Sequence, residues 1–197
     1  MSSKFPDKKP EFVIIKRRDS SGAWIAWHAI LSANECFVLN TDGASTTAGW
    51  SGGTKPTSSL IHVANNSDVN GNTYTYVFYA WHSVPGLTKV GTYYGGYDGS
   101  DPYNQNFCPT GFRPAFVLIK KDAGSASWQL FDDQRLGYNI DNNQLYPNTD
   151  AVQGTADYID IVSNGFKVRT NDSVVGAVAT YAYIAFASNT FEGANAR

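Results

Sequence analysis

The sequence predicts an all-β protein, an antiparallel and jelly-roll-like β-sandwich built from two related repeat units with little or no helix. Three observations point to this fold class. One phrase occurs twice without a gap, PEFVIIKRRDSSGAWIAWH at 10–28 and PAFVLIKKDAGSASWQLFD at 114–132, and a repeat of this length indicates one supersecondary unit used twice. Apolar residues come in short runs or alternate with polar ones, as they do in strands. Aromatic residues make up 14% of the chain and there are 18 glycines, which suits strands and tight turns.

The repeated phrase is expected to form a β-hairpin. Phe12–Ile15 is an apolar run rich in β-branched residues and too short for a helix. Asp19–Gly22 is a turn signal, and Trp24–Leu31 is expected as the return strand. The second copy predicts the same hairpin, with strands at 116–121 and 128–132.

The rest of the first unit is mostly polar until its last strand. Residues 1–9 are expected to form a flexible N-terminal arm, and residues 40–58, rich in Thr, Gly and Ser, a long loop. Leu60–Val63 predicts a weak strand. TYTYVFYAW at 73–81 has the period of two that is typical of a strand.

The second unit has a similar ending. TYAYIAFA at 180–187 matches TYTYVFYA at 73–80 and predicts the last strand. Before it, Ser163-Asn164-Gly165 separates two short apolar runs and predicts a hairpin, because Asn and Gly both tolerate a positive φ.

Four segments follow from this pattern. They are the arm at 1–9, an incomplete first repeat unit at 10–83, a Gly/Tyr-rich connecting segment at 84–113 and the second repeat unit at 114–191. Since neither unit has enough strands to cover both faces of its own sheet, we expect one fused globular body.

Charge excludes one class of partner. The formal net charge is −2, so the chain has no electrostatic footprint for nucleic acid. Its basic runs, Lys16–Arg18 and Lys120-Lys121, stand at equivalent positions of the repeat. They are expected to be solvated strand ends, with a polyanion-binding patch as the alternative.

The cysteines and the termini suggest nothing unusual. Cys36 and Cys108 are far apart in sequence and are expected to be reduced and buried, although a bridge between them stays open. The N-terminal residues lack the apolar region of a secretory signal peptide. The longest apolar runs are a few residues, so no membrane insertion is expected.

Patterns that carry chemistry are weak. There is no GxSxG or HExxH motif, and the three histidines are isolated. Asn66–Gly71 resembles the start of a calcium loop, but position 12 of that loop would be Val77 in place of glutamate. Asp132 and Asp133 are adjacent and would point to opposite faces of a strand. We therefore expect no catalytic residues, no metal site and no cofactor.

Recognition is the remaining possibility, and the connecting segment carries it. Tyrosine offers a flat apolar face together with a hydroxyl group, which suits a sugar ring or a protein surface. Tyrosines alternate there with Gly, Asp and Asn, and the alternative is that they pack within the fold. The candidate ligand-binding or partner-binding residues are Tyr93, Tyr94, Tyr97, Asp98, Asp101 and Tyr103.

Several stretches carry a family resemblance. They are HSVPGLTKVGTYYG at 82–95, TGFRPAFVLIKK at 110–121, YNIDNNQLYPN at 138–148, IVSNGFKVRT at 161–170 and TYAYIAFASNTF at 180–191. Together with Trp128, they resemble a domain of unknown function common in marine bacteriophages. That domain often occurs in tandem in tail-fibre-like and other virion proteins. The resemblance covers nearly the whole chain, with an incomplete first copy.

The resemblance implies a virion protein made in the host cytoplasm and released by lysis. It implies other virion proteins as partners, a host cell-surface glycan as a further partner, and a homo-oligomer for which a trimer is plausible. The leading hypothesis is a non-enzymatic virion structural protein of the tail-fibre type that contacts the host surface or another virion protein. The alternatives are a capsid decoration (knob) protein and a hydrolase of surface polysaccharide.

Overall fold

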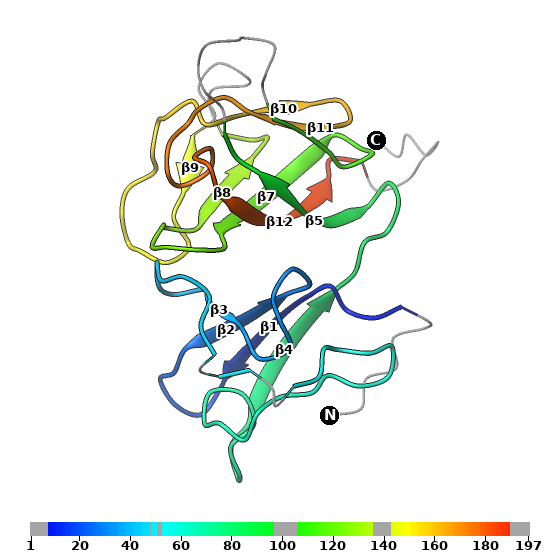
Figure 1. The fold of residues 1–197 in the computed structure, drawn as a ribbon, viewed down its shortest axis with the longest axis vertical. Helices are drawn as coiled ribbons and strands as arrows, with labels where there is room; N and C mark the ends of the chain where they lie inside the picture. The colour runs from blue at the N-terminus through cyan, green and yellow to red at the C-terminus, as the bar shows by residue number, and fades with distance from the viewer. Residues whose placement is uncertain (1–7, 48, 51–52, 97–105, 136–142, 190–197) are drawn as a thin grey trace. The chain divides into compact units, whose positions relative to one another are not determined.

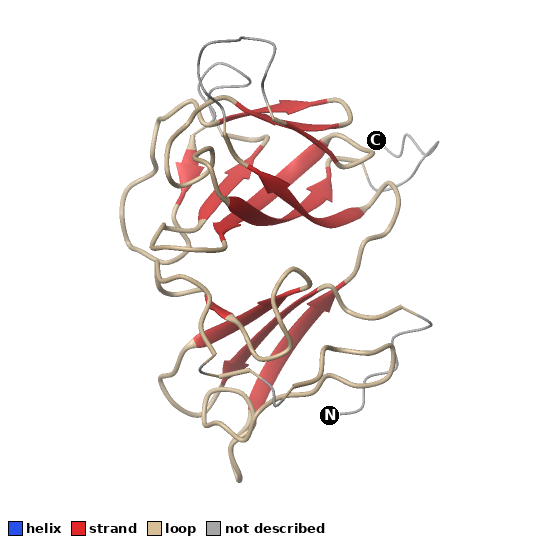
Figure 2. Ribbon diagram, viewed as in Figure 1, coloured by secondary structure: helices blue, strands red, loops and turns tan. Residues whose placement is uncertain are grey.

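The computed structural model describes residues 8–47, 49–50, 53–96, 106–135 and 143–189 (Figure 1). These residues form twelve β-strands and no helix, and every strand pairing is antiparallel (Figure 2). The chain divides into two compact units, unit 1 (Met1–His82) and unit 2 (Ser83–Arg197). The all-β prediction is confirmed.

Unit 1 contains one four-stranded sheet, in the order β3-β2-β1-β4. Its strands are β1 (Phe12–Arg17), β2 (Trp24–His28), β3 (Phe37–Val38) and β4 (Tyr76–Trp81). The predicted hairpin is confirmed, with Phe12 opposite His28 and Lys16 opposite Trp24. On the other side of β1, Phe12 lies opposite Trp81 of β4.

Loops supply part of the core of unit 1. Trp27 of β2 stacks on Trp50, which lies in the long loop, with ring centroids 5.8 Å apart. Gly49 brings this loop close to the sheet at a φ of 110°, where a Cβ would lie 3.2 Å from Ile25 Cδ1. The predicted strand at Leu60–Val63 is wrong, since no strand forms there. Its apolar pattern reflects burial of Ile61 in a loop.

Unit 2 is a two-sheet sandwich. A five-stranded sheet has the order β5-β12-β7-β8-β9, and a three-stranded sheet has the order β10-β11-β6. In Figure 1 the β10–β11 hairpin lies over the larger sheet. The strands are β5 (Thr88–Tyr94), β6 (Phe107–Pro109), β7 (Pro114–Lys121), β8 (Gln129–Asp132), β9 (Gln144–Leu145), β10 (Ile159–Val162), β11 (Gly165–Val168) and β12 (Thr180–Ala187).

Aromatic side chains join the two sheets of unit 2. Phe166 of β11 is fully buried and makes edge contacts with Tyr93 and Tyr183 of the larger sheet, at centroid distances of 5.9 and 5.2 Å. The hydroxyl of Tyr183 donates to Pro109 O at 3.4 Å, and that of Tyr181 donates to Ser173 O at 3.1 Å. These bonds satisfy polar groups that would otherwise be costly to bury.

The segment expected to connect the units contributes β5 and β6 to unit 2, one to each sheet. A glycine inside β5 is explained by close packing, because a Cβ on Gly91 would lie 2.6 Å from the Tyr183 ring. β5 pairs with β12 along its whole length.

The hairpin predicted at Ser163-Asn164-Gly165 is confirmed, but its explanation by positive φ is wrong. Val162 pairs with Gly165, so Ser163 and Asn164 form the turn, and neither Asn164 nor Gly165 has a positive φ. Gly165 lies within β11, where a Cβ would come within 2.2 Å of Cys108 O on β6. Close approach of the neighbouring strand therefore requires this glycine.

Corresponding strands of the two units share an order, β3-β2-β1-β4 in unit 1 and β9-β8-β7-β12 in unit 2. The hairpins also share a register, with Phe12 opposite His28 and Phe116 opposite Asp132. Each return strand is fixed in the same way, as Trp24 N donates to Asn40 Oδ1 and Trp128 N donates to Asn148 Oδ1. That the two units arose as a repeat stays a prediction.

The structural alignment of the last strands, β4 and β12, differs from their sequence alignment. Val13 lies opposite Ala80 in unit 1, and Val117 lies opposite Ala185 in unit 2. The sequence match had placed Ala187 against Ala80. The structure aligns Ala80 with Ala185, two residues away from the sequence alignment. Because side chains of a strand alternate with a period of two, this shift leaves each side chain on the face of the sheet that the sequence alignment gives it.

The two basic runs differ in environment. Lys120 is fully buried, and its Nζ donates to Ala126 O in the β7–β8 loop at 2.7 Å. The expectation of a solvated strand end is wrong for this residue. Its counterpart Lys16 is only partly buried, and its Nζ donates to Arg17 O and Ser20 O at 2.9 and 3.3 Å.

The two cysteines form no disulfide, and both are buried. Burial raises the pKa of each thiol to about 12, so the thiolate form is scarce at pH 8. Because the thiolate is the reactive form, we expect a chromogenic thiol reagent to label neither cysteine in the folded protein at pH 8. Both should react after denaturation. Absorbance of the released product measures this, and rapid labelling before unfolding would contradict it.

Candidate functional site

The structure separates the predicted tyrosine site into buried and exposed members. Tyr93 is 9% exposed and lies in the core of unit 2, stacked on Tyr181 at 5.0 Å. Its hydroxyl donates to Val175 O at 2.7 Å, and burial raises its pKa well above the usual value. Tyr93 therefore supports the fold and offers no ring face to a ligand.

The next residue has the opposite environment. Tyr94 ends β5 and is 63% exposed, since successive side chains of a strand point to opposite faces. The other candidates, Tyr97, Asp98, Asp101 and Tyr103, lie outside the described residues.

Unit 2 has two further exposed apolar side chains. Phe107, at the start of β6, is 41% exposed, and Val178 is 74% exposed. The side-chain amide of Asn106 donates to Tyr94 O at 2.9 Å and so ties the end of β5 to the start of β6. A Cβ on Gly96 would lie 3.7 Å from Val178. We call Tyr94, Phe107 and Val178 the loop-base rim.

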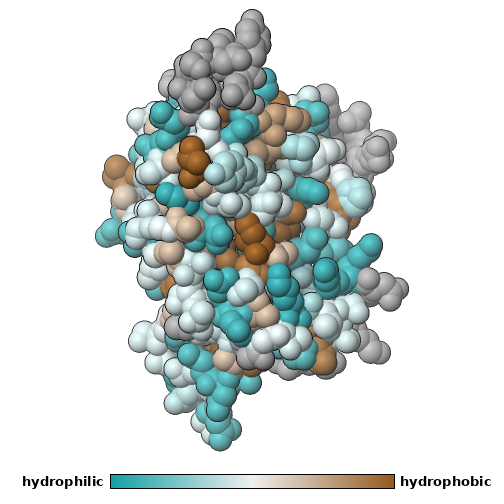
Figure 3. Space-filling model, in the orientation of Figure 1, coloured by the Kyte–Doolittle hydropathy of each residue, from teal (hydrophilic) through white to brown (hydrophobic). Residues whose placement is uncertain are grey.

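Strand pairing holds the backbone of Tyr94 and Phe107 in place. Tyr94 pairs with Thr180 of β12, and Phe107 pairs with Lys167 of β11. On the face seen in Figure 3, hydrophobic residues form small separate groups among polar ones. An aromatic face fixed by a strand can bind a ligand at low entropic cost.

Phe107 and Val178 were not among the site residues predicted from the sequence. The strand pattern of FCP at 107–109 is too short to recognise, and Val178 lies far from the tyrosines in sequence. Recognition of β5 as a strand would have separated Tyr93 from Tyr94, because one of two adjacent strand residues faces inward.

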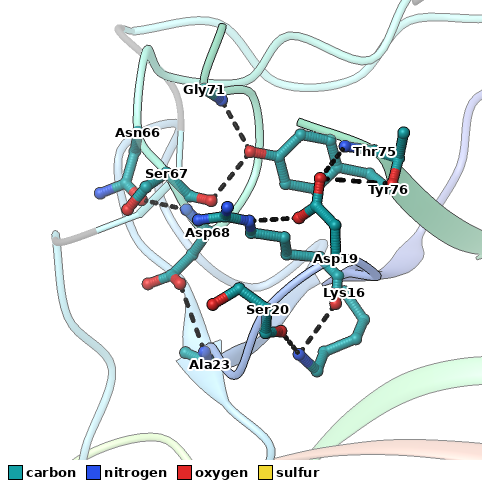
Figure 4. Close-up of polar contacts among 11 residues, drawn as sticks. Lys16, Asp19, Ser20, Ala23, Asn66, Ser67, Asp68, Gly71, Thr75 and Tyr76 are labelled. Carbon is teal, nitrogen blue, oxygen red and sulfur yellow. Dashed lines mark hydrogen bonds and ion pairs between the residues drawn. The ribbon is translucent and has the colours of Figure 1, made fainter. Parts of the chain in front are cut away.

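In unit 1, the residues resembling a calcium loop tie two turns together (Figure 4). Asn66 Oδ1 accepts a hydrogen bond from Asp68 N at 2.8 Å, and Asp68 Oδ1 accepts one from Ala23 N at 3.3 Å. The Tyr76 hydroxyl donates to Ser67 O and accepts from Gly71 N, both at 2.8 Å. These oxygens thus serve internal contacts.

Asp19 forms the other half of this network (Figure 4). Its carboxylate pairs with Arg17 Nε at 2.6 Å and accepts from Thr75 N at 3.0 Å. The hydrogen bond from Arg17, followed by that from Thr75, lowers the pKa of Asp19. The Arg17 guanidinium also lies over the Tyr74 ring at 3.3 Å. The network joins the β1–β2 turn to the segment before β4.

Other chemical groups are either structural or scattered. His28 is buried against Phe12, and its Nδ1 accepts from Ile30 N at 3.1 Å. Among the described residues, no three His, Cys, Asp or Glu side chains gather in a way that could hold a metal ion. None of the described segments forms an apolar helix of membrane-spanning length.

Comparison with known proteins gives one family. A family model described as a domain of unknown function, DUF7483, matches residues 4–190. No curated protein and no solved structure matches the chain. The family match covers both units.

Proposed function

This chain belongs to the DUF7483 family of domains of unknown function, and we propose that it is a non-enzymatic structural protein of a bacteriophage particle. In this proposal it is of the tail-fibre type and contacts the host cell surface. The motifs at 82–95, 110–121 and 161–170, which resemble a domain of phage virion proteins, support the assignment to a particle.

The observation that carries the binding role is the loop-base rim. Tyr94 and Phe107 come from different sheets of unit 2, and both keep much of their ring surface exposed. An exposed aromatic ring that a strand holds in place can contact a ligand or partner at low entropic cost. Loops at the end of a β-sandwich are a common place for recognition, because the sheets hold their bases rigid. A sugar ring or an apolar protein side chain would fit the Tyr94 face.

Replacement of Tyr94 by alanine is expected to weaken binding of the purified protein to cells of the phage's host by about tenfold. The physical reason is loss of one ring contact, on the order of 1.4 kcal/mol. Binding of labelled protein to intact cells, measured by flow cytometry over a concentration series, gives the affinity.

Tyr79→Ala is the matched control, since Tyr79 is a half-exposed strand tyrosine of unit 1. It should leave cell binding unchanged. Equal binding by wild type and Tyr94→Ala would exclude the rim as the contact. Immunogold labelling of particles tests the rest: label on the tail agrees with the proposal. Label on the capsid, together with binding to empty capsids and no binding to cells, would show instead that the protein is a capsid decoration protein.

A further inference from the structure

A polar depression lies at the end of β8, at the opposite edge of the five-stranded sheet from Tyr94. It is wide open to solvent and has a volume of about 580 Å³. Its lining residues are Asp132, Gln134, Arg135 and Gln153. Ligand sites in proteins commonly enclose about 300–1,000 Å³, so one or two sugar rings would fit.

Arg135 is held in position by two partners. Its Nε donates to Asp132 Oδ2 at 2.8 Å, and its Nη1 donates to Gln153 Oε1 at 3.0 Å. Asp132 Oδ1 also accepts from the backbone N–H groups of Gln134 and Arg135, at 3.0 and 3.1 Å. The carboxylate thereby fixes the turn that carries Arg135, and the guanidinium needs little ordering when a ligand binds.

The backbone beneath Gln153 is equally well fixed. Its neighbour Gly154 exchanges two hydrogen bonds with Gln144 of β9, at 2.9 and 3.1 Å. A Cβ on Gly154 would lie 2.3 Å from the Tyr146 hydroxyl, so a larger residue there would have to displace that side chain. The depression therefore rests on β8 at Asp132 and, beside Gln153, on the bridge between Gly154 and Gln144.

The side chains that line the depression offer both hydrogen-bond donors and hydrogen-bond acceptors to a ligand. A guanidinium has five N–H donors, and two of those on Arg135 have partners among the described residues. Within the described part of the chain, the Gln153 amide uses its oxygen for Arg135 and has no partner for its NH₂ group. In the same residues Gln134 donates through Nε2 to Asp133 Oδ1 at 2.7 Å, and its oxygen accepts no hydrogen bond. Donors and acceptors thus lie side by side.

Charge decides the class of ligand. Asp132 pairs directly with Arg135. The Asp133 carboxylate, which accepts a hydrogen bond from the Gln134 side chain, gives the end of β8 a second negative charge. A phosphate or a carboxylate would meet this excess of negative charge. A sugar hydroxyl carries no charge and both donates and accepts hydrogen bonds, which matches the groups available. We propose that this depression is a binding site for a neutral saccharide, with Arg135 and Gln153 as its main contacts. The site does not depend on the loop-base rim.

Ligand-observed NMR of the full chain tests the site with defined probes. The probes are methyl α-glucoside, methyl α-mannoside, methyl β-galactoside, glucuronate and inorganic phosphate. We expect at least one methyl hexoside to bind the wild-type protein and to bind more tightly than glucuronate or phosphate. Arg135→Ala should weaken that binding at least tenfold, and Gln153→Ala should weaken it severalfold.

Arg18→Ala is the matched control, because Arg18 is exposed in unit 1. It should leave hexoside binding unchanged, as should Tyr94→Ala. As a folding control, each variant should have the same thermal unfolding midpoint as the wild-type protein. The proposal is overturned if no methyl hexoside binds, if glucuronate or phosphate binds more tightly, or if folded Arg135→Ala and Gln153→Ala both bind as the wild type does. Loss of cell binding in Tyr94→Ala alone would leave the saccharide site standing.

Discussion

Replacement of Phe166 by alanine is expected to lower the free energy of unfolding of unit 2 by about 3–5 kcal/mol. Phe166 is fully buried and makes edge contacts with two tyrosines of the facing sheet. Its loss leaves a cavity between the sheets and removes both aromatic contacts. Denaturant titration, followed by a spectroscopic signal of unit 2, measures the change.

Phe107→Ala makes the same chemical change on the neighbouring strand β6. Phe107 is 41% exposed, whereas Phe166 is fully buried, so we expect a smaller cost of about 1 kcal/mol. If the two variants unfolded at similar denaturant concentrations, Phe166 would not be the contact that holds the two sheets together.

Trp50→Ala is expected to destabilise unit 1 by about 3–5 kcal/mol. Trp50 is 1% exposed and stacks on Trp27, with an angle of 13° between the rings. Unit 1 uses this loop residue to cover its sheet at a place where unit 2 uses a second sheet. The expected result is a lower denaturation midpoint for unit 1, measured by backbone circular dichroism or by the fluorescence of the remaining tryptophans.

Trp24→Ala is its control. Trp24 is 37% exposed, and its side chain has a cationic neighbour, Lys16 Nζ, 6.0 Å from its ring centroid. We expect this variant to lose about 0.5–1 kcal/mol, as for an exposed cation–π contact. A Trp50→Ala protein that unfolds like Trp24→Ala would mean that the loop does not complete the core of unit 1.

The sequence predicted those strands whose pattern is local. β1 and β2 were found because a β-branched run, a turn signal and a second run follow each other directly, and the copy at 114–132 showed the same order. β4 and β12 were found because their aromatic residues alternate with small or β-branched ones. In each case the strand carries its own signal.

The strands that were missed depend on distant partners. β5 contains Gly91, which disfavours a strand when it is considered alone and is explained only by the Tyr183 ring from β12. β6 is three residues long and ends with Pro109, and β3 and β9 are two residues each. No local pattern identifies such strands, because their pairing depends on partners far along the chain.

The candidate site shows the same limit. The sequence pattern singled out Tyr93 and Tyr94 alike, because it did not place them in a strand. The polar depression could not be found at all. Arg135 and Gln153 are 18 residues apart in the sequence, and the contact between them appears only once β9 and Gly154 have paired.

The pairing of β5 with β12 has a consequence for synthesis on the ribosome. All four strands of unit 1 have been made once residue 82 is added, whereas β5 must wait until the last strand of the chain emerges. At bacterial-scale elongation of about 5–20 residues per second, the delay is on the order of ten seconds. During that interval Val90 and Tyr93, which are buried in the finished fold, have no strand partner. Nascent chains of this protein should therefore depend on chaperones while β5 waits, and unit 1 should be the first part to fold.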